Sequence, residues 1–156
     1  MSNRIAYDKV APDPYKVMLG LEKYLHSCSI EPLLGHMVKM RASQINGCAF
    51  CLDMHSKDLM ALGETPQRIF GLDAWRECPY YTDRERAALE WTDALTLVHK
   101  THAEDEIYER VKPHFTDQEM VDLTWFIGTI NLWNRVAIAM RPEVGNYKSP
   151  IKKAEG

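Results

Sequence analysis

The chain has 156 residues, of which 46% are hydrophobic and 26% are charged, as in an ordinary folded protein of one domain. The net charge of -3 gives no electrostatic basis for binding nucleic acid or an anionic membrane surface. Residues 1–16 lack the apolar core of a signal peptide, and the apolar stretch 120–140 is interrupted by Asp122 and Arg135. We therefore expect a cytoplasmic protein with no membrane span, in which thiols stay reduced.

Helix start and stop signals follow one another through the first half of the chain. Asp13 precedes Pro14, which predicts an N-cap followed by proline at the first helical position. The pair Asn46-Gly47 is a favoured C-terminal signal and should end the second helix. The helices predicted here cover residues 13–28, 31–46, 48–63 and a short segment that begins at Thr65.

The second half is helical as well. Two capping boxes, residues 82–85 and 116–119, each precede apolar residues at helical spacing. Between them, residues 104–112 predict one short helix that ends before Pro113. No alternating strand pattern of useful length occurs, so the sequence predicts an all-α fold. We expect a single domain over residues 1–156, with a core at about 32–140 and a polar tail at about 146–156.

One stretch, NGCAFCLDMHSKDL at residues 46–59, concentrates reactive side chains. If Cys48 begins a helix, then Cys48, Cys51 and His55 share one face at positions i, i+3 and i+7. The first turn of a helix presents unpaired N–H groups and a positive dipole end, which stabilise a thiolate. A depressed thiol pKa suits peroxide reduction or disulfide exchange, and His55 can carry a proton near neutral pH. The pair could therefore cycle between dithiol and disulfide.

The residue types and their spacing alone leave other interpretations of this cluster open. A structural zinc site takes four ligands, and the cluster supplies three, so Cys28, Cys78 or His36 would have to complete it. The cysteines could also be buried structural residues, an interpretation weakened by their place at a helix entrance. Cys28 and Cys78 have no such context, and we interpret them as structural.

Several polar residues outside the cluster also carry expectations. Asp53 and Asp58 are expected to face solvent or to pair with Lys57. Asn131, Asn134 and Arg135 interrupt an apolar helix, and we expect them to satisfy buried backbone groups more often than to contact substrate. Trp75, Tyr80 and Tyr81 lie in an irregular stretch and could line a pocket or an oligomer contact.

The segment KMRASQINGCAFCLDMHSKDLMALGE closely resembles the core of the AhpD-like alkylhydroperoxidases, within the carboxymuconolactone decarboxylase superfamily. The resemblance continues through WRECPYYTDRERAALEWTDALT and TINLWNRVAIA, and so covers about residues 32–140. It implies an all-helical fold, assembly into homotrimers or homohexamers, and thiol-dependent peroxidase activity. The decarboxylase branch lacks the cysteine pair, so its lactone chemistry is not implied.

The resemblance also assigns roles. Cys51 matches the cysteine that attacks peroxide, Cys48 its partner, and His55 the relay histidine. The helix-entrance argument alone would favour Cys48 as the thiolate. One departure concerns His36, which stands where the family pattern has a glutamate that begins the proton relay. If the second and third helices form a hairpin about Gly47, His36 and His55 lie within roughly one turn of each other in height. His36 can pass a proton but lacks a carboxylate's charge, so His55 should be a weaker base.

The sequence thus predicts a thiol peroxidase or disulfide oxidoreductase that acts on hydrogen peroxide, alkyl hydroperoxides or a protein disulfide. No flavin or nicotinamide signature is present, so we expect no bound cofactor and no metal. Electrons would then arrive from an external thiol, such as a lipoyl or thioredoxin-like group. The alternative is a non-catalytic helical oligomer whose cysteine and histidine cluster is structural or binds metal.

Overall fold

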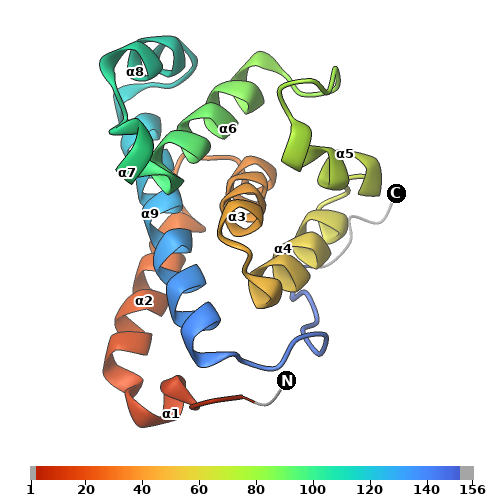
Figure 1. Ribbon diagram of the computed structural model, residues 1–156, viewed down its shortest axis with the longest axis vertical. Helices are drawn as coiled ribbons and strands as arrows, with labels where there is room; N and C mark the ends of the chain where they lie inside the picture. The colour runs from red at the N-terminus through yellow and green to blue at the C-terminus, as the bar shows by residue number, and fades with distance from the viewer. Residues whose placement is uncertain (1–2, 152–156) are drawn as a thin grey trace.

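The computed structural model describes residues 3–151, in which every regular element is helical (Figure 1). The all-α prediction is therefore confirmed. Nine α-helices occur in the described residues, and two 3-10 turns, at 72–74 and 112–114, follow α5 and α8. The helices are α1 (Tyr7–Val10), α2 (Pro12–Leu25), α3 (Pro32–Asn46), α4 (Ala49–Ala61), α5 (Pro66–Gly71), α6 (Asp83–Thr96), α7 (Val98–Thr101), α8 (Asp105–Val111) and α9 (Asp117–Met140).

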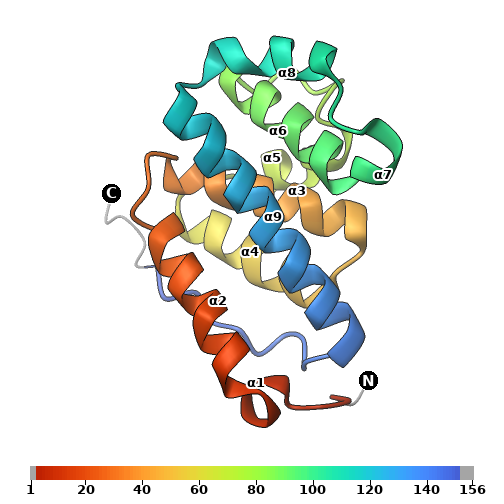
Figure 2. The same cartoon turned by 90° about the vertical axis from the view of Figure 1, so that its left-hand side faces the viewer.

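Helix α3 lies at the centre and packs against α4, α6 and α9 (Figure 1). Nine of its fifteen residues are buried, which explains why its sequence is apolar on more than one face. Gly35 allows α9 to approach, because a Cβ at this position would lie 2.7 Å from a ring carbon of Phe126. The long α9 crosses α3, and α2 runs beside α9 (Figure 2).

The predicted start signals hold with one exception. Both capping boxes form: the Thr82 and Thr116 hydroxyls accept the backbone N–H of Glu85 and Glu119, whose carboxylates accept in return. Asp13, however, is not an N-cap, because α2 already begins at Pro12 and places Asp13 in its first turn. A proline preset for helical backbone outweighs a side-chain cap one residue later.

The turn between α3 and α4 fixes the direction of both helices. Gly47 ends α3 with φ of 68°, a left-handed conformation that favours glycine. The N–H of Gly47 donates to the Gln44 carbonyl and that of Cys48 to the Ser43 carbonyl. Cys48 then serves as N-cap of α4, as the sequence predicts. The two helices form the predicted hairpin, which brings His36 and His55 together.

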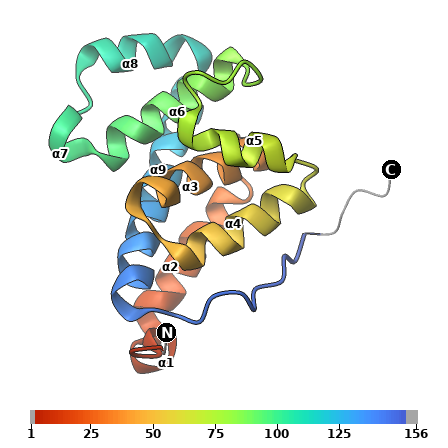
Figure 3. The same ribbon diagram turned by 45° about the vertical axis from the view of Figure 1, so that its right-hand side comes forward.

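After α9 the chain turns back and runs extended beside α4 (Figure 3). Lys57 holds it in place, since its ammonium donates to the carbonyls of Gly145 and Tyr147 at 3.1 and 3.0 Å. Part of the segment predicted as a polar tail contacts the helices: Tyr147 and Ile151 line a pocket, while residues 152–156 lie outside the described residues. Within residues 3–151, no helix has the length and hydropathy needed to cross a bilayer.

Candidate functional site

Cys48 and Cys51 form a disulfide at the beginning of α4, with their Cα atoms 5.4 Å apart. Both side chains are almost fully buried, yet Cys51 lines a pocket that reaches the surface. The Cys48 sulfur also accepts the backbone N–H of Cys51 at 3.4 Å, so it caps the helix. The predicted helix-entrance position of the pair is confirmed, and its sulfurs face each other.

His55 lies one turn beyond Cys51 on the same face of α4, and only 3% of its surface is exposed. Among the described residues, neither of its ring nitrogens has a hydrogen-bond partner, and the same holds for Nδ1 of His36. The two imidazole rings lie 5.5 Å apart between centroids. The predicted approach of His36 to His55 across the hairpin is therefore confirmed.

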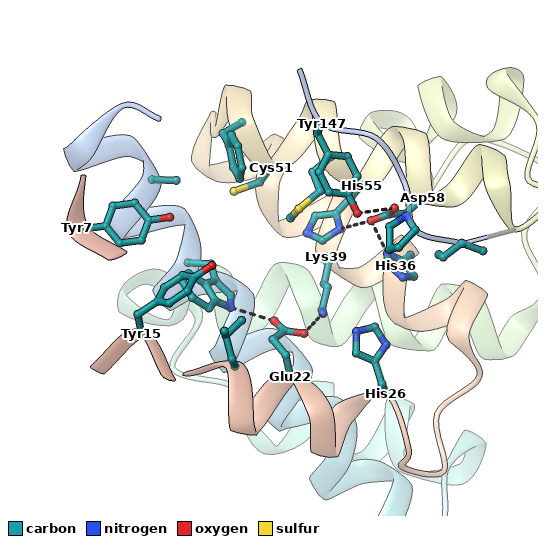
Figure 4. Close-up of a pocket in the computed structure, with 17 residues that line it drawn as sticks. Tyr7, Tyr15, Glu22, His26, His36, Lys39, Cys51, His55, Asp58 and Tyr147 are labelled. Atoms are coloured by element: carbon teal, nitrogen blue, oxygen red, sulfur yellow. Dashed lines mark hydrogen bonds and ion pairs between the residues drawn. The ribbon is translucent and has the colours of Figure 1, made fainter. Parts of the chain in front are cut away.

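Asp58 overturns an expectation: it neither faces solvent nor pairs with Lys57. It is 3% exposed, and its Oδ2 lies 3.7 Å from Nδ1 of His36 and 3.8 Å from Nδ1 of His55. The Tyr147 hydroxyl donates to Oδ1 at 2.9 Å (Figure 4). Lys57 pairs instead with Asp53 at 2.9 Å. The sequence did hold a signal, since residues 51, 55 and 58 recur at the spacing of one helix face.

Burial controls the charge of the two histidines. It lowers the pKa of His36 from 6.5 to about 4, and the nearby Lys39 ammonium acts in the same direction while Asp58 opposes it. The pKa of His55 is lowered well below its usual value, again chiefly by burial, with Lys39 and His36 adding to the effect. Both imidazoles are therefore neutral at pH 7 and can accept a proton.

A pocket of about 280 Å³ opens beside these groups. One end is polar: the Lys39 ammonium contacts the Glu22 carboxylate at 2.5 Å, and that carboxylate also accepts Nε1–H of Trp133 at 2.9 Å (Figure 4). The other end is apolar and largely aromatic. Its walls come from α1, α2, α4, α9 and the segment after α9, through Tyr7, Tyr15, Leu19, Phe50, Met54, Trp133 and Ile151.

The potential donors to a cation agree only in part with those that the sequence suggested, which were His55, His36 and the cysteines. His36, His55 and Asp58 place one donor atom each within 4.8 Å of the others, and neither cysteine belongs to this group. The positive charge of Lys39, which lowers both histidine pKa values, also opposes a cation at this point. We therefore interpret the two histidines as groups that hold and move a proton, with the Asp58 carboxylate beside them. Cys28 and Cys78, interpreted as structural, are free thiols in the described structure.

Other polar residues secure the frame of the site. Asn46 at the end of α3 donates to the side-chain carbonyls of Asn131 and Asn134 at 2.9 and 2.8 Å. Asn134 in turn donates to the Ser43 hydroxyl at 3.0 Å, and Asn131 to the Ile127 carbonyl at 2.9 Å. The two asparagines thus tie α9 to the hairpin, and they satisfy side-chain groups as well as the expected backbone group.

Comparisons with known proteins agree with this fold. The sequence profile of the Carboxymuconolactone decarboxylase family matches residues 12–94. The uncharacterised protein YdfG of Bacillus subtilis is 46% identical over 140 residues, which cover 90% of this chain and 95% of YdfG.

Solved structures extend the comparison. A protein of unknown function from Agrobacterium tumefaciens, provisionally named as the antioxidant defence protein AhpD, is 43% identical with a TM-score of 0.90. That alignment covers 94% of this chain and 100% of the Agrobacterium protein. The debrominase Bmp8 shares the fold with a TM-score of 0.74 at 19% identity, over 86% of this chain and 73% of its own.

Proposed function

The chain belongs to the carboxymuconolactone decarboxylase family, and on that basis we propose that it is a thiol-dependent peroxidase of the AhpD-like type. One observation carries this proposal: the bonded pair Cys48–Cys51 borders a pocket beside a buried histidine that is neutral at pH 7. A sulfur nucleophile, a base and room for a substrate are what such a reaction requires.

The proposed reaction uses the two cysteines, the peroxide and one external reductant. The Cys51 thiol gives its proton to His55, and the thiolate attacks one peroxide oxygen. An S–O bond forms, the O–O bond breaks, and the leaving oxygen takes the proton from His55 to become an alcohol. Cys48 then displaces water from the sulfenic acid and forms the disulfide. An external dithiol of the lipoyl or thioredoxin type restores both thiols by exchange.

The pocket supports an organic hydroperoxide as substrate. Hydrogen peroxide needs no aromatic walls, whereas Tyr15, Phe50 and Trp133 offer an apolar surface next to Cys51. A polar group of the substrate could meet the Glu22–Lys39 pair, to which the Trp133 indole N–H also donates. We expect cumene hydroperoxide to react faster than hydrogen peroxide for this reason.

The proposal is tested by counting thiols and measuring intact mass before and after one equivalent of cumene hydroperoxide. The reduced protein should lose two thiols and become lighter by two hydrogens, through a Cys48–Cys51 disulfide. Cys51→Ser should give no disulfide and no sulfenic acid at residue 48, whereas Cys48→Ser should stop at the sulfenic acid of Cys51. Cys28→Ser and Cys78→Ser are the matched controls and should behave as the parent. A reduced protein that keeps all its thiols in peroxide would contradict the proposal.

The same samples distinguish this peroxidase from the second class of function, a non-catalytic module with a structural or metal-binding cluster. Tightly bound zinc at one atom per chain after purification would favour it.

We also propose that the chain forms homotrimers or homohexamers. Val121, Trp125 and Leu132 on α9 are about half exposed and offer an apolar surface for such contacts.

A further inference from the structure

Asp58 is a buried carboxylate with few fixed donors. The Tyr147 hydroxyl bonds one of its oxygens, while the other oxygen faces two imidazoles at 3.7 and 3.8 Å. These distances exceed a direct hydrogen bond but lie within the range of an ion pair. A charge is normally buried only with a partner, because desolvation costs several kcal/mol.

The Lys39 ammonium does not fill this role. Lys39, one turn beyond His36 on α3, directs its ammonium to Glu22 on α2. Burial keeps both histidines neutral at pH 7. Among residues 3–151, the ion-pair contacts of Asp58 are with these two rings, so it gains a positive partner when one of them takes a proton. Its position therefore favours the protonated form of either ring.

We propose that Asp58 is a positioning residue that stabilises the imidazolium formed when His55 accepts the Cys51 proton, and that it shares this charge with His36. This inference rests on the proposed peroxidase function. The proton moves from the Cys51 sulfur to His55 and returns to the leaving oxygen, and Asp58 itself neither gains nor loses one. The long N–O distance shortens as the ion pair forms.

Asp58 thus supplies the charge that His36 lacks. The carboxylate comes from α4, on the opposite side of the hairpin from residue 36. Tyr147 fixes its orientation from the segment after α9, so the chain beyond the helices completes the arrangement. The other charged or titratable groups around His55 are Lys39 and His36 on α3, Glu22 on α2, His26 at the C-cap of α2, and Cys51 on α4.

The test compares Asp58→Asn, Asp58→Glu and the control Asp117→Asn, whose carboxylate is 96% exposed and pairs with Lys112 away from the pocket. The rate of disulfide formation with cumene hydroperoxide is measured in quenched reactions from pH 5 to 9. At pH 7 we expect Asp58→Asn to be about 10- to 100-fold slower, by analogy with the loss of general-base assistance. Asp58→Glu should recover about tenfold of that loss, and Asp117→Asn should stay within about twofold of the parent.

A second readout separates charge from structure. In NMR titrations of the imidazole Cε1–H signals, Asp58→Asn should lower the pKa of His55 by about one further unit, because a neutral amide no longer favours the charged ring. A rate within twofold of the parent at every pH would overturn the proposal. So would a uniform loss that Asp58→Glu fails to repair, with the His55 pKa unchanged.

Two further outcomes are decisive. Zinc at one atom per chain in the parent, lost in Asp58→Asn, would make Asp58 a metal ligand and overturn the inference. If the parent forms no disulfide with peroxide, the proposed function fails, whereas the titration of His55 still decides the role of Asp58. Should Asp58→Asn not fold, Asp58→Glu and Tyr147→Phe supply the same rate and titration data.

Discussion

Two buried carboxylates, Asp93 on α6 and Asp58 on α4, have opposite surroundings. Asp93 accepts Nε of Arg41 at 2.7 Å, Nη1 of Arg76 at 2.6 Å and Nε1 of Trp75 at 3.1 Å. Within the part of the chain that the structure describes, Asp58 accepts one hydroxyl and faces two neutral imidazoles beyond hydrogen-bond distance. Asp93 is paired with permanently charged arginines and joins elements of the fold. Asp58 instead gains a charged partner when a neighbouring histidine is protonated. Fixed donors thus mark a structural carboxylate.

The largest effect is expected where Asp93 loses its charge. Asp93→Asn leaves Arg41, whose side chain is 12% exposed, without its buried counter-charge, which should cost about 3–5 kcal/mol of unfolding free energy. Asp73→Asn is the matched control: it contacts the same arginine, but its side chain is 77% exposed, so the cost should stay below about 1 kcal/mol. Urea unfolding at pH 7 measures both. Equal losses in the two variants would remove the basis of the comparison.

The pocket side of the molecule should be the acid-sensitive one. Between pH 6.5 and about 4 the unfolded chain protonates His36 while the folded chain keeps it neutral. Stability is therefore full above pH 6.5 and falls as the pH decreases toward 4, by about 3 kcal/mol in total. Urea unfolding at pH 7 and pH 4.5 should show a smaller loss in His36→Asn than in the parent. His99→Asn, at an exposed position, should show the same loss as the parent.

A carboxylate at residue 36, as in the family pattern, tests how charge next to His55 affects the reaction. His36→Glu adds a negative charge close to His55, which should raise the pKa of His55 by about one unit and shift the pH profile of disulfide formation upward. We expect a rate a few times faster at pH 7. His26→Glu adds the same charge farther away, at the C-cap of α2, and should leave the profile in place. An unchanged rate and profile in His36→Glu would contradict the altered relay.

The smallest effect is expected at the hydroxyl that orients Asp58. Tyr147→Phe removes one hydrogen bond, worth about 1 kcal/mol, and should slow disulfide formation by about fivefold at pH 7. Tyr24→Phe removes an equivalent bond to Asp122, which also accepts Ser29 and Gln118. That variant should lose a little stability and keep its rate in the same assay. A slower reaction in Tyr24→Phe than in Tyr147→Phe would go against the assignment.

Local signals in the sequence were sufficient for most of the fold. The Thr82 and Thr116 capping boxes and the Gly47 turn act over a few residues, so their geometry could be read directly from the residue types. The face shared by Cys48, Cys51 and His55 follows from helical periodicity alone. The approach of His36 required only the length of the hairpin arms, measured from Gly47.

The remainder of the site depends on contacts between distant segments. Glu22 meets Lys39 because α2 packs beside the hairpin, and no local pattern encodes that contact. Tyr147 belongs to an extended segment without periodicity, so its bond to Asp58 could not be predicted. The sequence alone favours Asp58 facing solvent or pairing with Lys57, which the structure contradicts. Its spacing from Cys51 and His55 was the better guide.

Part of the pocket wall comes from segments outside the stretch that carries the sulfurs. The family profile matches residues 12–94, which include both cysteines and His55 but not Tyr7, Trp133, Tyr147 or Ile151. A substitution in these outer segments would therefore reshape the pocket while leaving the helical hairpin and its two sulfurs in place. Pocket shape and the cysteine pair can in this way change independently of each other.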